Sequence, residues 1–261
     1  MPYRSRRPSA GGAVRPVALI TGASSGIGAA VAARIAAEGG WHLLLNGRDE
    51  ERLTAVAKET SGTPLPTDLT DPRGREWLVA RALHREGRVD ALIAGAGIGW
   101  AGPFTRMPAG ALDAVLSVNL SAALHLVRLV LPGMVARGTG HIVLIGSMAG
   151  CVGVRDEAVY AAAKGGLMSF AESLRYELAR TGVRVSMILP GAVDTPFFTR
   201  RGVPYHRNRP RPVPASRVAD AVWSALAAGR DDAFVPPWLA LPARVHGLAP
   251  GVFRALARRF G

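Results

Sequence analysis

Short apolar runs alternate along the chain with longer stretches of helical periodicity, beginning at residue 17. The apolar runs are continuous rather than alternating with polar residues, which is typical of strands buried on both faces. They predict strands at 17–20, 41–45, 63–69, 91–94, 141–145, 183–189 and 233–235. The periodic stretches between them predict helices at 25–38, 50–59, 73–86, 112–137, 157–181 and 216–228.

Strands that alternate with helices in this way predict a parallel sheet covered by helices on both faces. The expected fold class is α/β, a doubly wound parallel sheet of Rossmann type in three layers, α/β/α. No linker and no repeat interrupts residues 16–236, so we interpret this range as a single catalytic domain. Within it, residues 197–214 hold four prolines and show no periodicity, which predicts a lid loop over about 196–214.

Length and composition narrow the class of protein. A chain of 261 residues with 49% hydrophobic residues is neither disordered nor fibrous. No run of about 18 apolar residues predicts a membrane-spanning helix, and the N-terminus lacks the apolar core of a secretory signal. The single cysteine, Cys151, excludes an intramolecular disulfide and favours a reducing, cytoplasmic location; we interpret it as a small core filler.

The net charge of +13 is concentrated at the two ends of the chain. Residues 1–16 hold four arginines and no acid, and residues 197–261 hold eleven arginines against three aspartates. We interpret residues 1–15 as a basic, flexible N-terminal segment. No helix-turn-helix, zinc or RNA-binding signature accompanies this charge, so no nucleic-acid partner is expected.

Residues 237–261 form a basic, amphipathic C-terminal extension that lies beyond the last expected strand. A helix is expected to begin at Pro250, with an apolar face made of Val252, Phe253, Leu256, Ala257 and Phe260. A helix this short is unstable alone, so its apolar face must dock on something. Its own domain, a second subunit of a homo-oligomer and an anionic membrane surface are the alternatives.

A glycine-rich sequence, Thr-Gly-Ala-Ser-Ser-Gly-Ile-Gly at 21–28, follows the first expected strand and opens the first expected helix. Glycines allow a tight turn there, and a helix N-terminus offers free N–H groups to a pyrophosphate. The strand–loop–helix context therefore predicts nucleotide binding. The candidate residues are Gly22, Ser24, Ser25, Gly26, Ile27 and Gly28.

Tyr160 and Lys164 are spaced i, i+4, so a helix would present them on one face. An ammonium group near a phenol stabilises the phenolate and lowers the phenol's pKa toward the range needed for proton transfer. Such a pair is common on protein surfaces, but Lys164 is one of only two lysines beside thirty arginines. Ser147 ends the fifth expected strand, at the sheet edge where such folds bind ligands. Asn119 lies among apolar residues, where it either needs polar partners or caps a helix irregularity.

The Thr-Gly-x-x-x-Gly-x-Gly and Tyr-x-x-x-Lys motifs together resemble the short-chain dehydrogenase/reductase family, in its single-domain branch, over about residues 15–235. The resemblance implies a catalytic tetrad of Asn119, Ser147, Tyr160 and Lys164. It also implies further cofactor contacts from Asp68 and Leu69 at the adenine, from Gly95, from Tyr160 and Lys164, and from Pro190, Gly191, Val193 and Thr195 beside the nicotinamide. One departure is visible: residues 94–97 read Ala-Gly-Ala-Gly where the family often has Asn-Asn-Ala-Gly, which puts local rigidity in doubt.

The end of the second expected strand indicates which nicotinamide cofactor binds. An acidic residue at the strand tip would hold the ribose hydroxyls and select NAD. Here Arg48 follows Asn46-Gly47, and a guanidinium can pair with a 2′-phosphate in a bidentate way. Asp49 is the rival residue, but it directly precedes the helix expected at 50–59, where an N-cap is needed. NADP(H) is therefore the expected cofactor.

The expected function is that of an NADP(H)-dependent oxidoreductase that transfers a hydride between the nicotinamide and a carbonyl or secondary alcohol. Tyr160 would act as general acid and base, Ser147 would polarise the oxygen, Lys164 would lower the pKa of Tyr160 and hold the ribose, and Asn119 would hold a relay water. The substrate is a small molecule, expected to be apolar because of Trp100, Met148, Val152, Phe197 and Phe198. The histidines show no metal-ligand spacing, so no metal is expected.

Two alternatives stay open. A 3-oxoacyl-thioester reductase, acting on acyl-carrier protein or coenzyme A substrates, would use the lid arginines Arg200, Arg201, Arg207, Arg209 and Arg211. A non-catalytic NADP-binding sensor or scaffold would need no proton relay, so the complete tetrad disfavours it.

Overall fold

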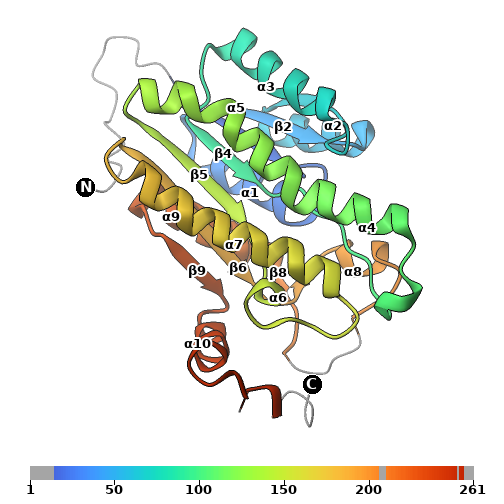
Figure 1. Cartoon of the computed structure of the whole chain (residues 1–261). Helices are drawn as coiled ribbons and strands as arrows, with labels where there is room; N and C mark the ends of the chain where they lie inside the picture. Colours follow the sequence, from blue (N-terminus) through green and yellow to red (C-terminus); the bar gives the residue numbers. More distant parts are fainter. Residues whose placement is uncertain (1–14, 206–209, 252, 256–261) are drawn as a thin grey trace.

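The computed structural model describes residues 15–205, 210–251 and 253–255 (Figure 1). Within these residues, seven parallel strands form one sheet in the order β3-β2-β1-β4-β5-β6-β9. The strands are β1 Val17–Thr21, β2 His42–Gly47, β3 Thr63–Pro66, β4 Ala91–Ala94, β5 Gly140–Ile145, β6 Val183–Pro190 and β9 Asp232–Val235. The expected doubly wound parallel sheet is confirmed.

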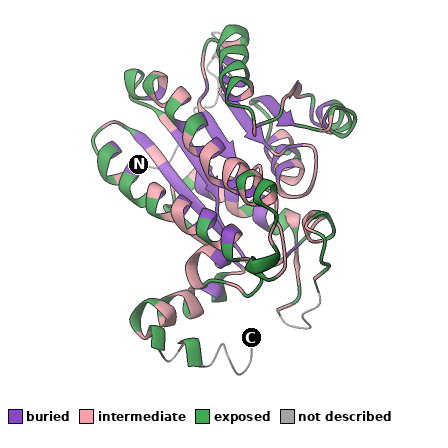
Figure 2. Ribbon diagram, turned by 45° about the vertical axis from the view of Figure 1, so that its right-hand side comes forward, coloured by how far each residue is buried: buried purple, intermediate pink, exposed green. Residues whose placement is uncertain are grey.

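Helices cover both faces of the sheet, and Figure 2 shows the buried strands between them. One face carries α1 Gly26–Glu38, α2 Glu50–Thr60 and α9 Ala215–Ala228, and the other carries α3 Pro72–Glu86, α4 Ala109–Leu116, α5 Ala122–Ala136 and α7 Ala158–Leu178. Successive residues of β1 explain why the strands are continuously apolar. Leu19 packs into the core beneath α3, α5 and α7, whereas Ile20 packs beneath α1, α2 and α9.

Two aspartates cap helices, and the sequence indicated the first of them, Asp49. The Asp49 carboxylate accepts a hydrogen bond from the Arg52 backbone N–H at 3.0 Å and caps α2. The Asp71 carboxylate accepts from the Arg73 N–H at 2.9 Å and caps α3. Because Asp49 serves the helix N-terminus, it is not a free carboxylate at the strand tip.

The expected continuous helix at 112–137 is wrong in its middle. Residues Ser117–Ser121 form a π-helical turn between α4 and α5, of the kind that often occurs at functional sites. By length and composition, the stretch Ala109–Arg137 is apolar enough to cross a membrane, although the sequence predicted no such helix. Its inner side chains, including Leu126 and Met134, are buried in the core against the sheet.

The expected lid and C-terminal extension contain structure that the sequence did not reveal. The lid includes a short helix, α8 Phe197–Arg200, and a two-residue strand, β8 Val213–Pro214, that pairs with β7 Val193–Asp194. The extension includes α10 Ala240–Leu248. Helical backbone does resume at Pro250, but residues 252 and 256–261, which complete the expected apolar face, lie outside the described residues, as do 1–14 and 206–209.

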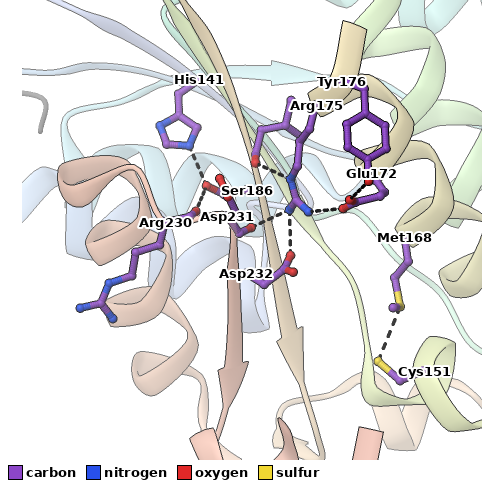
Figure 3. A network of polar contacts seen from close by, with 11 residues as sticks. His141, Cys151, Met168, Glu172, Arg175, Tyr176, Ser186, Arg230, Asp231 and Asp232 are labelled. Carbon is purple, nitrogen blue, oxygen red and sulfur yellow. Dashed lines mark hydrogen bonds and ion pairs between the residues drawn. The ribbon is translucent and has the colours of Figure 1, made fainter. Parts of the chain in front are cut away.

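A polar network fixes α7 against the far edge of the sheet (Figure 3). The Arg175 guanidinium on α7 donates to the Asp231 carbonyl at 2.7 Å, the Asp232 carboxylate at 2.8 Å and the Glu172 carboxylate at 2.9 Å. Nearby, the ring of His141 lies 2.8 Å from the Ser186 hydroxyl, and burial lowers the pKa of His141 to about 4. The network anchors the helix that carries Tyr160 and Lys164.

Candidate active site

A cleft of about 1730 Å³ opens at the carboxyl ends of the strands. It lies where β1 has β2 on one side and β4 on the other, the point at which doubly wound sheets bind ligands. All of the expected cofactor-binding residues line this cleft, together with Ser147, Tyr160 and Lys164. Of the expected site residues, all of which the structure describes, Asn119 alone does not line it.

Two glycines of the loop after β1 lie so close to neighbouring backbone that no side chain would fit at their positions. Gly22 has φ +72°, and a methyl group there would lie 2.8 Å from the Ala96 Cα. A methyl group on Gly28 would lie 2.3 Å from the Gly22 carbonyl oxygen. Ser25 is the N-cap of α1 and makes no side-chain capping bond. The first turn of α1 therefore brings unbonded N–H groups to a cradle that fits a pyrophosphate.

Thr21 supports the segment after β4, whose rigidity the sequence put in doubt. Its hydroxyl oxygen accepts hydrogen bonds from the backbone N–H of Gly95 at 3.1 Å and of Ala96 at 3.2 Å. The hydroxyl also lies 3.4 Å from the Ile93 carbonyl oxygen, to which it donates. A buried side chain on β1 thus replaces the side-chain support that the Ala-Gly-Ala-Gly sequence lacks.

The tip of β2 presents Arg48 to the cleft. Arg48 is exposed at the rim, while the preceding Asn46 is buried and donates to the carbonyls of Leu65 at 3.1 Å and Thr67 at 3.3 Å. These bonds join the ends of β2 and β3 and explain an asparagine that sequence analysis did not single out. The Asp49 carboxylate lies 2.6 Å from the Arg52 guanidinium, whose hydrogen bond lowers the pKa of Asp49.

A buried arginine, which sequence analysis also missed, connects the part of the cleft at Asp68 and Leu69 to the π-helical turn. The guanidinium of Arg75 donates to the Leu69 carbonyl at 2.6 Å and to the hydroxyls of Ser117 at 2.6 Å and Ser121 at 3.0 Å. Its side chain therefore fixes the loop that carries Asp68 and Leu69. Asp68 itself accepts from the Thr70 N–H at 2.8 Å, which holds its carboxylate at the cleft.

Tyr160 and Lys164 lie on one face of α7, with the Lys164 Nζ 5.8 Å from the centre of the Tyr160 ring. Burial raises the pKa of Tyr160 to about 12, while a hydrogen bond with the Ser147 side chain opposes this shift. The expectation that Lys164 lowers the pKa of Tyr160 is not met. Lys164 is itself buried and donates to the Ile145 carbonyl at 2.8 Å, and desolvation lowers its own pKa to about 8.

The lowered pKa of Lys164 predicts a pH dependence of stability. Between about pH 8 and 10.5, the unfolded chain holds a proton on Lys164 that the native chain has released, so stability rises with pH there. We expect Lys164 to increase the free energy of unfolding by about 2 kcal/mol from pH 7.5 to pH 9.5. Urea unfolding of the wild type, Lys164→Met and Lys58→Met measures this increase.

Lys58 is the other lysine of the chain and is exposed. Lys58→Met should keep the increase, and Lys164→Met should lose it. An equal increase in all three proteins would show that the ammonium of Lys164 is solvated in the native state.

Asn119 lies in the π-helical turn, behind the cleft wall. Its amide N–H donates to the carbonyls of Ile98 at 2.8 Å and Val115 at 2.9 Å. Its Oδ1 atom is buried without a hydrogen-bond partner among the described residues. A methyl group on Gly97 would lie 2.9 Å from this oxygen and 4.0 Å from Lys164 Nζ, so the two polar groups flank Gly97. An unsatisfied acceptor at this place fits a bridging water.

Apolar side chains line the end of the cleft beyond Tyr160. Four of the five expected pocket residues contribute, namely Met148, Val152, Phe197 and Phe198. Trp100 does not line the cleft, and its ring lies against Gly102. The C-terminal extension adds Trp238, Leu241, Val245 and Phe253, which sequence analysis did not assign to the site. Cys151 packs against the Met168 sulfur at 3.6 Å, as a core filler.

The chain is similar to known oxidoreductases. The family model for short chain dehydrogenases matches residues 16–203. An uncharacterized oxidoreductase of Staphylococcus saprophyticus is 38% identical over 187 residues, which cover 69% of this chain and 80% of that protein. A variant of the actinorhodin polyketide ketoreductase in complex with NADPH is 32% identical, with a TM-score of 0.78 and coverage of 86% of this chain and 97% of that one.

A short chain dehydrogenase/reductase from Burkholderia phymatum is in complex with NAD instead. It is 27% identical, with a TM-score of 0.80, and the match covers 89% of this chain and 92% of that chain. Nicotinamide cofactors with and without a 2′-phosphate thus occur among similar structures. Similarity of fold therefore does not decide between NAD and NADP as the cofactor of this chain. The choice has to be argued from the residues at the tip of β2.

Proposed function

The chain belongs to the short-chain dehydrogenase family, and on that premise we propose that it is an NADP(H)-dependent reductase of an apolar carbonyl compound. The observation that carries the proposal is the shared cleft. Tyr160, Ser147 and Lys164 line the same space as the glycine cradle and Arg48. When bound, the nicotinamide supplies or takes up the hydride, and the side chains of this chain hold the substrate and handle the proton.

Tyr160 acts as the general acid in this proposal. With a pKa of about 12, its hydroxyl stays protonated at neutral pH and can donate to the oxygen of a carbonyl that is being reduced. The Ser147 hydroxyl, bonded to Tyr160, orients and polarises the same oxygen. The reverse reaction would require Tyr160 to lose this proton first, and its raised pKa opposes that loss at neutral pH.

Lys164 and Asn119 complete the proposed tetrad as positioning groups. Lys164 Nζ uses one of its three donors on the Ile145 carbonyl, which leaves two for a ribose hydroxyl and a water. The unpartnered Oδ1 of Asn119 would accept from that water and so connect Tyr160 and Lys164 to a proton relay. Neither role requires the side chain to contact the substrate.

A second candidate function, reduction of 3-oxoacyl thioesters, is favoured by the similarity to the actinorhodin polyketide ketoreductase. The contacts of the lid arginines support this second candidate less strongly than the sequence alone did. Arg201 forms an ion pair with the half-buried Glu157, and Arg200 donates to Ser25 at 3.0 Å. Arg201 is therefore neutralised within the described structure, whereas Arg200 bonds to a neutral hydroxyl and keeps its charge.

Turnover separates these proposals from a non-catalytic NADP sensor. The experiment is a panel of aromatic and aliphatic ketones and 3-oxoacyl thioesters, each tested with NADPH and with NADH by loss of absorbance at the nicotinamide. We expect the highest kcat/KM with NADPH and an apolar ketone. Saturable NADPH binding without oxidation by any carbonyl would identify a sensor, and a preference for thioesters would select the second candidate.

We also propose that the C-terminal extension contacts an anionic membrane surface. Leu248 is 89% exposed at the end of α10, and Leu241 and Trp238 are 67% and 54% exposed. Residues 236–261 contain four arginines and no acidic residue, which complements anionic headgroups. Leu241 and Trp238 also line the cleft, so an apolar substrate would enter beside the membrane. A homo-oligomer remains the competing prediction for the same surface.

Leu248→Gln is expected to lower binding to anionic vesicles about tenfold, because one exposed leucine would no longer enter the bilayer interface. Co-sedimentation with phosphatidylserine-containing vesicles measures the binding, and Leu83→Gln, at an exposed leucine on α3, is the control. If the full chain does not bind anionic vesicles, or if Leu248→Gln instead changes the sedimentation coefficient of the protein, the extension is an interface between subunits. A point variant is preferable to truncation at residue 250, because Phe253 and Arg254 line the cleft.

A further inference from the structure

The short helix α8 contacts the nucleotide cradle at one end and the catalytic helix at the other. At its C-terminal end, the Arg200 guanidinium donates to the Ser25 hydroxyl in the glycine-rich loop at 3.0 Å. At its start, the ring of Phe197 packs on the ring of Tyr160, with 5.4 Å between their centres. Figure 1 shows α8 at the end of the sheet toward which the strand arrows point.

Arg200 belongs to a cluster of guanidinium groups at the rim of the cleft. Arg48 and Arg200 line the cleft beside Arg52. Burial, and after it the positive charges of Arg52 and Arg48, lower the pKa of Arg200, so the three groups lie within range of one another's charge. The carboxylate whose charge acts on Arg200, that of Asp49, is already engaged by Arg52 at 2.6 Å and by the N-terminus of α2.

The contacts of Arg200 differ from those of its neighbour on the lid. Arg201 is neutralised by Glu157 in an ion pair whose side chains are only 8% and 15% exposed. Arg200 forms no ion pair within the described residues and bonds instead to a neutral hydroxyl. A guanidinium has five N–H donors, so this one bond leaves Arg200 with further donors in the cleft that Arg48 also lines.

From this arrangement we infer that Arg200 is a second binding group for the 2′-phosphate of NADP(H), which it approaches from the lid while Arg48 approaches from β2. The inference rests on the proposed function and names a specificity residue for it. A phosphate monoester is largely dianionic at neutral pH, and two guanidiniums can each make charge-assisted hydrogen bonds to it. NADH carries no such group and would leave Arg200 on Ser25.

The same helix connects phosphate recognition to the catalytic residue. A phosphate held by Arg200 restrains α8, and α8 carries Phe197 against Tyr160 and is tied to the start of α7 by Arg201 and Glu157. The 2′-phosphate therefore favours the conformation in which α8 packs on Tyr160. Loss of Arg200 should affect reactions with NADPH and leave those with NADH unchanged.

The test compares Arg200→Met with Arg217→Met, which removes the same charge from an exposed position on α9 outside the cleft. Fluorescence titrations give the Kd of NADPH and NADH. Competition by adenosine 2′,5′-bisphosphate is compared with competition by adenosine 5′-phosphate, because the two differ only in the 2′-phosphate. For Arg200→Met we expect a roughly tenfold weaker NADPH and bisphosphate Kd, and a Kd of NADH and adenosine 5′-phosphate within about twofold of the wild type. The ratio between the NADPH Kd of Arg200→Met and that of the wild type should fall as the salt concentration is raised.

Arg200→Lys, which keeps the charge but not the planar fork, should recover part of the affinity for NADPH. Equal weakening of NADPH and NADH would show that Arg200 only holds the lid, and unchanged NADPH binding would overturn the inference. Failure of the proposed function is distinct from either result. It would appear in the wild type, as absence of carbonyl turnover or as preference for NADH.

Discussion

Replacing Tyr160 by phenylalanine is expected to lower kcat by a factor on the order of 10²–10⁴ and to leave the Kd of NADPH within about twofold. The substitution removes the hydroxyl that donates the proton and keeps the ring that packs on Phe197 at 5.4 Å. The loss should therefore fall on the chemical step and not on cofactor binding. Steady-state kinetics with the preferred ketone, together with fluorescence titration of NADPH, measure both quantities.

The matched control is Tyr176→Phe. Tyr176 lies on the same helix α7, is 73% exposed and hydrogen-bonds to Glu172. Its hydroxyl has no route to the cleft, so kcat should not change. Tyr160→Phe with a kcat near that of the wild type would exclude Tyr160 as the proton donor, and a matched loss of NADPH binding would indicate a structural role.

Replacing Arg48 by aspartate is expected to lower the ratio of kcat/KM for NADPH to that for NADH by about a hundredfold or more. The variant loses a charge-assisted pair with the 2′-phosphate and places a like charge beside it. A carboxylate at the strand tip can also accept hydrogen bonds from the ribose hydroxyls of NADH, so part of the change should be a gain with NADH. Kinetics with both cofactors at a fixed ketone concentration measure the ratio.

Arg81→Asp makes the same charge change on the exposed surface of α3, away from the cleft, and should leave the ratio unaltered. If Arg48→Asp also leaves the ratio unaltered, Arg48 is not the selector and the preference must come from elsewhere at the rim. A wild type that already prefers NADH would overturn the assignment of NADP(H) itself.

Local patterns determined much of this protein. Continuous apolar runs predicted the parallel strands because each strand is covered on both faces, as Leu19 and Ile20 show. Asp49 marked the start of a helix because a cap acts within three residues of the chain. The i, i+4 spacing of Tyr160 and Lys164 was enough to bring them to one face of α7.

Contacts between distant residues decided what local patterns could not. In the π-helical turn, the side-chain amide of Asn119 donates a hydrogen bond to the carbonyl of Ile98. Arg75 on α3 holds the same turn by hydrogen bonds to Ser117 and Ser121. Arg200 reaches Ser25 across 175 positions of the chain. The linear sequence does not reveal these contacts, since each partner is supplied by another element.

Desolvation was decided by the tertiary structure as well. The sequence by itself placed an ammonium beside a phenol and so predicted a lowered pKa for Tyr160. Burial raises that pKa to about 12 and lowers the pKa of Lys164 to about 8. The spacing of two side chains sets their distance, but the number of atoms packed around them sets how far water can stabilise their charges. That quantity exists only once the sheet, α7 and the lid are assembled.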